Sequence, residues 1–239
     1  MKHLILLGLL PLFLIRVQAQ EFSDSHINKA DKEGRRQGVW RLYDDDGNLK
    51  FTGEYYNGKP VSDFKFYYPS GKLKALIINL DSGRIAYAKN YFTDGKLMAE
   101  GKYVNQKKDS IWSYYSEFDG TLSAEEYYKD AMKEGIWRTY YPEGQVAEEI
   151  TYVGDKKNGP WIQYFTDGKI KLKALYQDDL IEGQYIIYHF NGMVEISGTY
   201  KHSGKDGIWV YMKETGEMEK REEYKDGVLV KTEILNEQK

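Results

Sequence analysis

The side chains that most often carry out chemistry are few and scattered in this sequence. Its four histidines show no His-x-x-x-His spacing and no pairing with a glutamate: His3, His26, His189 and His202. Metal sites and nucleophile–base pairs need such groups close together, and the chain has no cysteine to supply a thiolate. We therefore predict no catalytic, cofactor-binding or metal-binding residue, and we expect a protein that is not an enzyme.

Carboxylates are the remaining candidates, because paired acids can act as general acid and base. Adjacent glutamates recur at one place of a repeating pattern: Glu125 and Glu126, Glu148 and Glu149, Glu222 and Glu223. Catalytic acids would need a pocket and separated pKa values, whereas recurrence at a repeat position indicates the solvated face of a sheet. Residues 44–48 (DDDGN) faintly resemble a calcium loop but lack the distal bidentate glutamate, so we interpret them as a polar turn.

The elements that hold these side chains are set by a repeat. One glycine recurs eight times in steps of 24 residues, with a single step of 25: Gly47, Gly71, Gly95, Gly120, Gly144, Gly168, Gly192 and Gly216. The extra residue lies in the segment SEFDG, where a turn tolerates an insertion. A fixed period of this length is the signature of a tandem-repeat protein.

Four further columns keep the same period. Seven residues before the glycine, or eight in the lengthened unit, comes a column that contains all five tryptophans: Trp40, Phe64, Ala88, Trp112, Trp137, Trp161, Tyr185 and Trp209. Three residues later comes a tyrosine column: Tyr43, Tyr67, Tyr91, Tyr115, Tyr140, Tyr164, Tyr188 and then Met212. An apolar residue follows the glycine by two positions, from Leu49 to Met218, and a second tyrosine column follows it by eight, from Tyr55 to Tyr224.

Each unit therefore predicts a β-hairpin. An aromatic strand such as residues 135–141 leads into a turn whose glycine can take the positive φ that hairpins require. The second strand alternates, so Val146, Ile150 and Tyr152 are expected on one face and Ala147, Glu149 and Thr151 on the other. Since one hairpin cannot bury its apolar face alone, the units are expected to stack into one elongated, twisted, all-β antiparallel sheet.

One stretch departs from the pattern. The third unit has Ala86 and Ala88 where glycine and tryptophan are expected, and the second unit ends in Asn79 instead of tyrosine. These departures predict a bend or a weakened stretch around residues 77–92. Together with the two ends of the array, they are the places where a special site is expected.

The chain begins like an exported protein. Residues 1–19 combine Lys2, an apolar run of 12 residues and small residues before Gln20, which is the anatomy of a secretory signal peptide cleaved near Ala19. The run is shorter than a bilayer span, so we expect a mature chain without a transmembrane segment, in the periplasm or outside the cell. Residues 20–33 are expected to form a flexible lead-in, residues 34–233 the eight-unit array, and residues 234–239 a tail.

The charge argues against one class of partner. The formal net charge is −3, and the basic residues form no stripe or cluster. Nucleic acid binding draws most of its affinity from neutralised phosphates, so nucleic acid is not an expected partner.

The unit G-x-W-x-x-Y-(Y)-x-x-G-x-Φ-x-x-x-x-x-Y-x-x-G, where Φ is apolar, resembles the bacterial variant of the MORN repeat that is found in YwqK-type antitoxin-like proteins. The resemblance covers residues 34–233. It implies a fold of stacked hairpins. For function it implies a scaffold, a protein-binding surface or a membrane-associating module, and it implies no cofactor.

Three hypotheses for function follow. The first is an exported, non-catalytic scaffold that binds a protein at the cell envelope. The second is a module that binds carbohydrate or peptidoglycan, because exposed aromatic columns can stack on sugars; burial of Trp112, Trp137 and Trp161 would remove that ladder. The third, implied by the resemblance alone, is an antitoxin-like immunity protein.

Overall fold

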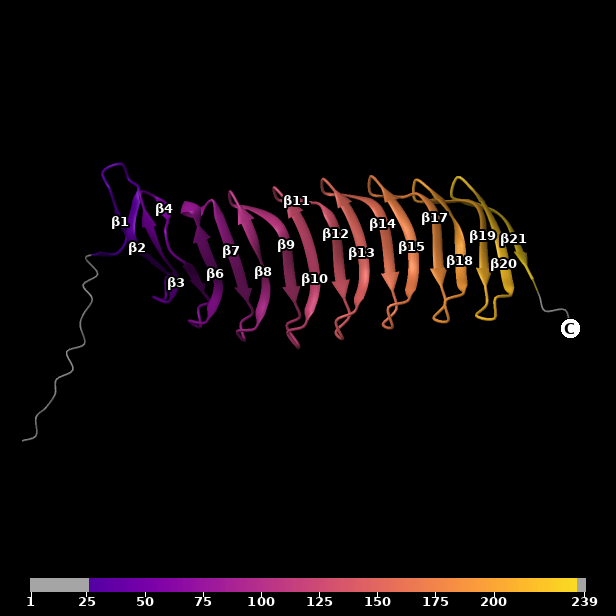
Figure 1. Ribbon diagram of the computed structural model, residues 1–239, viewed down its shortest axis with the longest axis horizontal. Coiled ribbons are helices and arrows are strands. Elements are labelled where there is room, and N and C mark those ends of the chain that lie inside the picture. The colour runs from indigo at the N-terminus through magenta and orange to yellow at the C-terminus, as the bar shows by residue number, and fades with distance from the viewer. Residues whose placement is uncertain (1–25, 236–239) are drawn as a thin grey trace, which may run out of the picture.

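The computed structural model describes residues 26–235, which form one elongated sheet a single layer thick (Figure 1). The leader, the first part of the lead-in and residues 236–239 of the tail lie outside the described residues. The strands are β1 (Lys29–Ala30), β2 (Arg36–Tyr43), β3 (Leu49–Tyr56), β4 (Lys59–Pro60), β5 (Phe64–Tyr67), β6 (Leu73–Leu80), β7 (Ile85–Tyr91), β8 (Leu97–Val104), β9 (Lys107–Tyr115), β10 (Leu122–Lys129), β11 (Met132–Lys133), β12 (Gly135–Tyr140), β13 (Val146–Val153), β14 (Lys156–Tyr164), β15 (Ile170–Gln177), β16 (Leu180–Ile181), β17 (Gly183–Tyr188), β18 (Val194–Lys201), β19 (Gly204–Met212), β20 (Met218–Lys225) and β21 (Val228–Ile234).

The topology is a continuous meander. With three interrupted strands each counted as one, every strand pairs antiparallel with the next along the chain, from β1–β2 to β20–β21. The two-residue strands β4, β11 and β16 are the first halves of interrupted strands that continue as β5, β12 and β17. The predicted all-β sheet of stacked hairpins is confirmed.

Seven of the eight hairpins use the same turn, and the fourth has a turn one residue longer, in which the Gly120 amide donates to the Ser116 carbonyl. In the first one, the Gly47 amide donates to the Asp44 carbonyl and the Asp44 amide donates to the Asn48 carbonyl. The turn glycines all have positive φ, between 76° and 98°. Only glycine adopts this conformation without strain, which is why one glycine marks every unit.

Each hairpin also carries a bulge just after its turn. In the fifth unit Tyr140 pairs with Val146, whereas the preceding Thr139 pairs with Glu148, so one extra residue is inserted in the second strand. All eight hairpins show this shift at the same place. Because paired residues share a face, the bulge puts Val146 on the face opposite to Ile150 and Tyr152. The expectation that these three share a face is therefore wrong.

The units are joined by tight turns in which both central residues have positive φ. Examples are Asn57 with Gly58, Asp178 with Asp179 and His202 with Ser203. Such turns match the twist of the flanking strands. The exception is the short 3-10 helix η2 (Asp81–Gly83) between β6 and β7.

The departures at Ala86 and Ala88 do not weaken the pairing of strands. β6 and β7 pair over six consecutive residues without a register shift. Ala86 and Ala88 are both buried. The strand pairing here is therefore regular, and the expected bend or weakened stretch stays a prediction.

The two ends of the sheet differ. Residues 28–30, inside the predicted lead-in, cover the outer edge of β2, so that part of the lead-in is paired. The Asn28 side chain donates to the Arg41 carbonyl and accepts from the Arg41 amide, as a strand residue would. The opposite end is β21, a full strand that follows the eighth hairpin and ends one residue beyond the predicted array.

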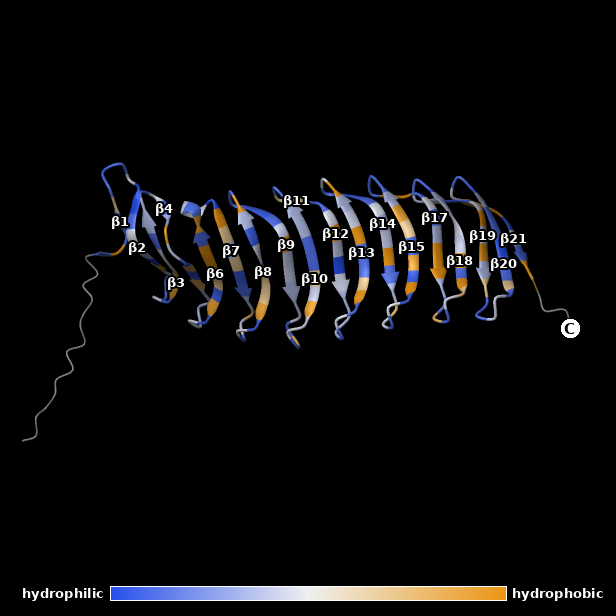
Figure 2. Ribbon diagram, viewed as in Figure 1, coloured by the Kyte–Doolittle hydropathy of each residue, from blue (hydrophilic) through white to orange (hydrophobic). Residues whose placement is uncertain are grey.

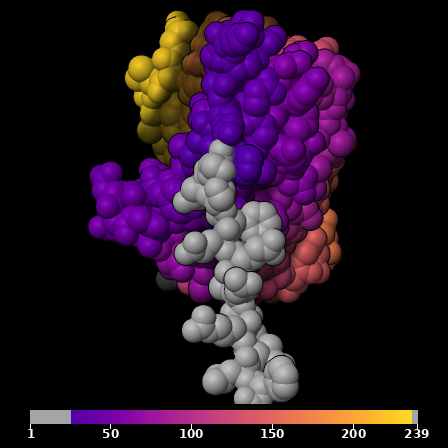
Figure 3. All heavy atoms as spheres, turned by 90° about the vertical axis from the view of Figure 1, so that its left-hand side faces the viewer, coloured from indigo at the N-terminus to yellow at the C-terminus, as the bar shows by residue number. Residues whose placement is uncertain are grey.

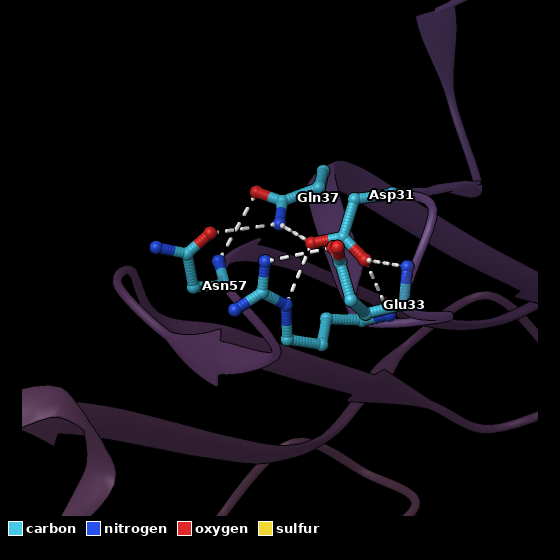
Figure 4. A network of polar contacts seen from close by, with 5 residues as sticks. Asp31, Glu33, Gln37 and Asn57 are labelled. Carbon is cyan, nitrogen blue, oxygen red and sulfur yellow. Dashed lines mark hydrogen bonds and ion pairs between the residues drawn. The ribbon is translucent and has the colours of Figure 1, made fainter.

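A polar network holds the covered end (Figure 4). Asp31 accepts hydrogen bonds from the Arg35 amide, the Arg35 guanidinium and the Gln37 amide group, and Gln37 also bonds Asn57 in the next turn. Desolvation raises the pKa of Asp31, but these hydrogen bonds together outweigh it and leave the pKa below its usual value. The network ties residues 31–37 to the β3–β4 turn.

The sheet has no second layer within the described residues. Hydrophobic and hydrophilic bands alternate along the strands in Figure 2, and the turns at both rims are largely hydrophilic. In the view along the array, the C-terminal units stand out to one side behind the N-terminal ones, so the sheet twists (Figure 3). Burial in a single layer depends on large aromatic side chains.

Candidate functional site

The tryptophan column lies on one face of the sheet, which we call the Trp face. Residues paired with these tryptophans share this face, such as Gly53 with Trp40 and Glu222 with Trp209. Trp112 and Trp209 are buried, at 2% and 1% exposure, whereas Trp40, Trp137 and Trp161 are half-buried. None of the five is exposed, and the proposed sugar-stacking ladder is at best half-accessible.

The two buried tryptophans each lie over a glycine of the preceding strand. Trp112 lies over Gly101 and Trp209 over Gly198, so closely that a Cβ on either glycine would come within 2.3 or 2.2 Å of the indole. Trp137 and Trp161 both pair with Ile150 instead, and the branched side chain occupies the space between them. Size also accounts for Ala88, because this small residue pairs with the large Ile77.

The indole N–H groups are used by the sheet itself. Those of Trp112, Trp137 and Trp209 donate to the carbonyls of Lys102, Tyr127 and Thr199, each ten residues earlier in the chain. The Trp161 indole donates to Glu148. A buried donor that is already paired is not available to a ligand, so this column is mainly structural.

The second tyrosine column packs on the same face and brings a column of cations that sequence reasoning missed. Trp137, for example, contacts both Tyr128 and Tyr152. Lys133 lies 4.4 Å above Trp137 and 5.0 Å from Tyr152. The equivalent position is cationic in six units, and in the five without Arg84 the cation lies over an aromatic ring: Arg36, Lys108, Lys133, Lys157 and Lys205. The signal was present, since these residues stand four before the tryptophan column.

Of the paired glutamates only Glu223 is exposed, which corrects the expectation of a solvated face for the other five. Glu222 is 8% exposed and accepts hydrogen bonds from Lys220, Tyr211 and Tyr224. The bond from Lys220, followed by that from Tyr211, lowers the pKa of Glu222 to about 2. A carboxylate with this pKa stays ionised and cannot act as a general acid.

The fourth unit repeats this cluster. Glu126 accepts from Tyr128, Lys108 donates to Tyr114 at 2.6 Å, and Trp112 lies beside Lys108. Burial, followed by the bond to Glu126, raises the pKa of Tyr128 to about 12. Burial also lowers the pKa of Lys108. The fourth and eighth units thus share a closed arrangement of tryptophan, lysine, glutamate and two tyrosines.

The first tyrosine column lies on the opposite face, because it is three residues from the tryptophans. There Tyr115, Tyr140 and Tyr164 donate to Glu100, Glu125 and Glu149 of the preceding units. Each bond joins two units across a spacing of 15 residues. The two predicted aromatic columns therefore do not form one surface, and further predicted carboxylates serve as structural acceptors.

The remaining polar candidates also have structural partners. His189 bonds the Met212 carbonyl, just as Tyr68 and Tyr141 at the same repeat position bond the carbonyls of Tyr91 and Tyr164. Asp44 accepts bonds from Asn48 and Asp46 within its turn. Residues 26–235 hold no group of three or more His, Asp or Glu side chains that could bind a metal ion.

A hollow opens on the Trp face of the first three units. Leu42, Phe51, Phe66 and Ala75 pair in sequence across β2, β3, β5 and β6, and so form its floor. This part has a volume of about 560 Å³. Phe51 is buried, but Leu42 and Phe66 are 49% and 36% exposed.

The hollow continues toward the next units. An adjoining space of about 700 Å³ shares Tyr55, Phe64 and Phe66 with the first and reaches Asn79 and Ala86. We call the two together the aromatic hollow. Two of its lining residues are smaller than their counterparts in most other units, since Phe64 stands in the tryptophan column and Asn79 in the second tyrosine column. These two departures therefore mark the site through missing side-chain volume, whereas Ala86, which replaces a glycine, does not.

The rim of the aromatic hollow is cationic. Arg36, Lys50 and Lys74 line the first part and Lys59 lines the second, and neither lining contains a carboxylate. Arg36 stacks 4.7 Å from Trp40 and donates to the Tyr55 hydroxyl. A positive rim around an apolar floor is notable in a chain whose net charge is −3. The arrangement can bind an apolar group with acidic neighbours, and it contains no nucleophile–base pair.

Solved structures resemble the chain only distantly. The chain is 11% identical to a chain of the crystal structure of TcdB2-TccC3-TEV, with a TM-score of 0.20, and the match covers 81% of this chain and 11% of that chain. It is 10% identical to a porin-like protein from Bacteroides uniformis, with a TM-score of 0.20 and coverage of 80% of this chain and 92% of that chain. TM-scores this low support no inference about fold or function. No curated protein matches the chain.

A family model does match. The model of the MORN repeat variant aligns with residues 36–57, 61–78, 86–105, 133–153, 157–178 and 181–202, which together make up just over half of the chain. The two units outside these matches are the fourth and the eighth, which share the closed cluster around Trp112 and Trp209. Both units nevertheless have the same strands and bulge as the other six. On this evidence the chain belongs to the MORN repeat variant family.

Proposed function

We propose that this chain is an exported, non-catalytic scaffold that binds another protein at the cell envelope through the aromatic hollow. Export is supported by the signal-peptide pattern of residues 1–19. A scaffolding role is supported by the repeat architecture and by the structural use of the recurring acids. No helix in residues 26–235 is long and apolar enough to cross a membrane. The observation that carries the proposal is the exposed apolar floor of the hollow, at Leu42 and Phe66.

The hollow defines the kind of partner. Its floor accepts a large apolar side chain, and such anchors dominate the energy of protein interfaces. Arg36, Lys50, Lys59 and Lys74 favour carboxylates next to that anchor. The proposed ligand is therefore a polypeptide segment with one or two apolar side chains flanked by Asp or Glu.

The test starts from the hollow in the exported protein. A photo-crosslinking amino acid is placed at Leu42, at Phe66 and, as a control, at Leu175, which is 43% exposed on the opposite face. One protein should be cross-linked from Leu42 and Phe66 but not from Leu175. The cross-linked protein, once purified, should then bind the chain. Leu42→Glu should raise the dissociation constant of this complex by about tenfold or more, since an interface anchor contributes more than about 1 kcal/mol. Leu175→Glu should leave it within about twofold.

Two results would contradict the proposal. One is identical cross-linking from both faces. The other is that the purified chain binds peptidoglycan or a glycan, and that Leu42→Glu weakens this sugar binding but no protein binding. That result would favour the carbohydrate hypothesis instead.

A further inference from the structure

The C-terminal edge of the sheet is open. β21 pairs with β20 on its inner side, and within residues 26–235 no strand pairs with its outer side. Four of its apolar side chains and the residue after it are between 48% and 67% exposed: Val228, Leu229, Val230, Ile234 and Leu235. The strand has no proline, and its one register shift lies at Val230, so residues 231–234 pair regularly with β20 and present a regular unpaired edge, which is a template for strand addition.

The other edge is closed to the same reaction. Lys29 and Ala30 pair with Gln37 and Arg36, and Asn28 uses its amide group on both backbone groups of Arg41. A strand arriving at β2 would have to displace these residues. Growth by joining the C-terminal edge of one molecule to the N-terminal edge of the next is therefore disfavoured, and any partner of β21 must bring an edge of its own.

The sequence of β21 is complementary to itself in an antiparallel arrangement. With Thr232 opposite Thr232 of a second copy, Lys231 stands opposite Glu233 and Val230 opposite Ile234, and each of these pairs occurs twice. Opposite charges, β-branched pairs and threonine pairs all stabilise antiparallel neighbours. Lys231 and Glu233 lie on the same face, since they pair with Glu223 and Arg221 on β20. Centring the pair on Lys231 instead would place two lysines opposite each other.

We propose that β21 is a pairing strand for a second copy of this chain, with a twofold axis through Thr232. Backbone hydrogen bonds between the two β21 strands join two sheets into one of twice the length. The contact is isologous, so it closes after two molecules and does not lead to fibres. The two aromatic hollows then lie at the far ends of the joined sheet. The inference does not depend on what the hollow binds.

The charge pair gives the first test. The mass of the purified chain is measured by light scattering after size exclusion, and twice the mass of one chain is expected. Lys231→Glu places two pairs of like charges across the axis, so it should raise the dissociation constant of the dimer by at least about tenfold. The double variant Lys231→Glu with Glu233→Lys restores opposite charges and should restore the dimer. Lys29→Glu on the covered edge serves as the control and should leave the mass unchanged.

The register gives the second test, because the chain has no cysteine of its own. Thr232→Cys should form a disulfide-linked dimer on mild oxidation, since directly opposed residues have Cα atoms about 4.5–5.5 Å apart, within disulfide range. Lys231→Cys alone should not, because its two copies are diagonal neighbours about 7–8 Å apart. A mixture of the Lys231→Cys and Glu233→Cys chains should cross-link.

Any of three outcomes would overturn the proposal. The first is a monomer at every concentration reached. The second is a dimer that Lys231→Glu leaves intact while circular dichroism shows the variant to be folded. The third is a series of growing oligomers that Lys29→Glu dissolves, which would place the contact between opposite ends of the array.

Discussion

The indole of Trp112 rests on Gly101 of the preceding strand, with room for a hydrogen atom on that glycine but not for a methyl group. Gly198 and Trp209 repeat this relationship four units later. In both places the tryptophan is among the most buried side chains of the single-layered sheet formed by residues 26–235. The stability of the array therefore depends on contacts between a small residue and a large one across the boundary of two units.

Gly101→Ala tests this contact. The added Cβ would come within 2.3 Å of the Trp112 ring, so the indole must move outward, and we expect a loss of about 1–3 kcal/mol. The midpoint of urea unfolding measures it, and iodide quenching should show one more accessible tryptophan. If the clash is the cause, Trp112→Ala and Gly101→Ala should be less than additive when combined. Full additivity would contradict this explanation.

Glu222→Gln tests the buried carboxylate. The pKa of Glu222 is about 2 in the folded chain against an ordinary value of 4.5, so folding favours its ionised form. The resulting stabilisation, on the order of 2–3 kcal/mol, is complete above about pH 5.5 and is lost as the pH falls from 4.5 toward 2. Unfolding midpoints of both chains between pH 2 and 7 should therefore converge at the acidic end. A constant difference across that range would show that the carboxylate charge is not the cause.

Lys133→Met tests the column of cations. Methionine keeps the apolar stem but removes the charge that lies between Trp137 and Tyr152, which should cost about 0.5–1 kcal/mol. Lys156→Met is the matched control, because Lys156 forms only an exposed ion pair with Asp178 and such pairs contribute little. Thermal unfolding compares the two. Equal effects would mean that the ring contacts of Lys133 add nothing.

Asn28→Ala tests the cover on the N-terminal edge. It removes both hydrogen bonds to the Arg41 backbone, so the Arg41 amide should exchange with deuterium faster. Peptides from β12 to β18 should be unaffected, because each unit contacts only its neighbours. Lys29→Ala, which leaves the backbone pairing of β1 in place, is the control. Unchanged exchange across β2 would show that another group covers this edge.

The fold was largely predictable from the sequence because its determinants are local and repeated. Turn glycines such as Gly144, with φ of 90°, recur where the chain must adopt a conformation that other residues avoid. The bulge was not predictable, since a one-residue shift leaves no composition signal and yet moves Val146 to the other face. Regular alternation assigns faces correctly only up to such an irregularity.

The location of the candidate site could be predicted from the sequence, but its shape could not. The substitutions at Asn79 and Ala86 marked the region, yet a hollow depends on the volume of side chains from three units that are distant in sequence. The glutamates were misjudged for a related reason. Glu222 and Tyr211 are 11 residues apart, and only the strand register brings the carboxylate to the hydroxyl.

The placement of Trp112 on Gly101 also determines how such a chain can change in length. Trp112 and Trp209 each complete their packing with a glycine 11 positions earlier, in the preceding unit, so neither 24-residue unit packs its tryptophan by itself. Removal or duplication of a whole 24-residue unit preserves the spacing between each tryptophan and its partner. It changes only which two units become neighbours. A gene encoding this array can therefore gain or lose complete units by unequal recombination and still specify a folded protein, provided that the new junction sets a small residue under a large ring.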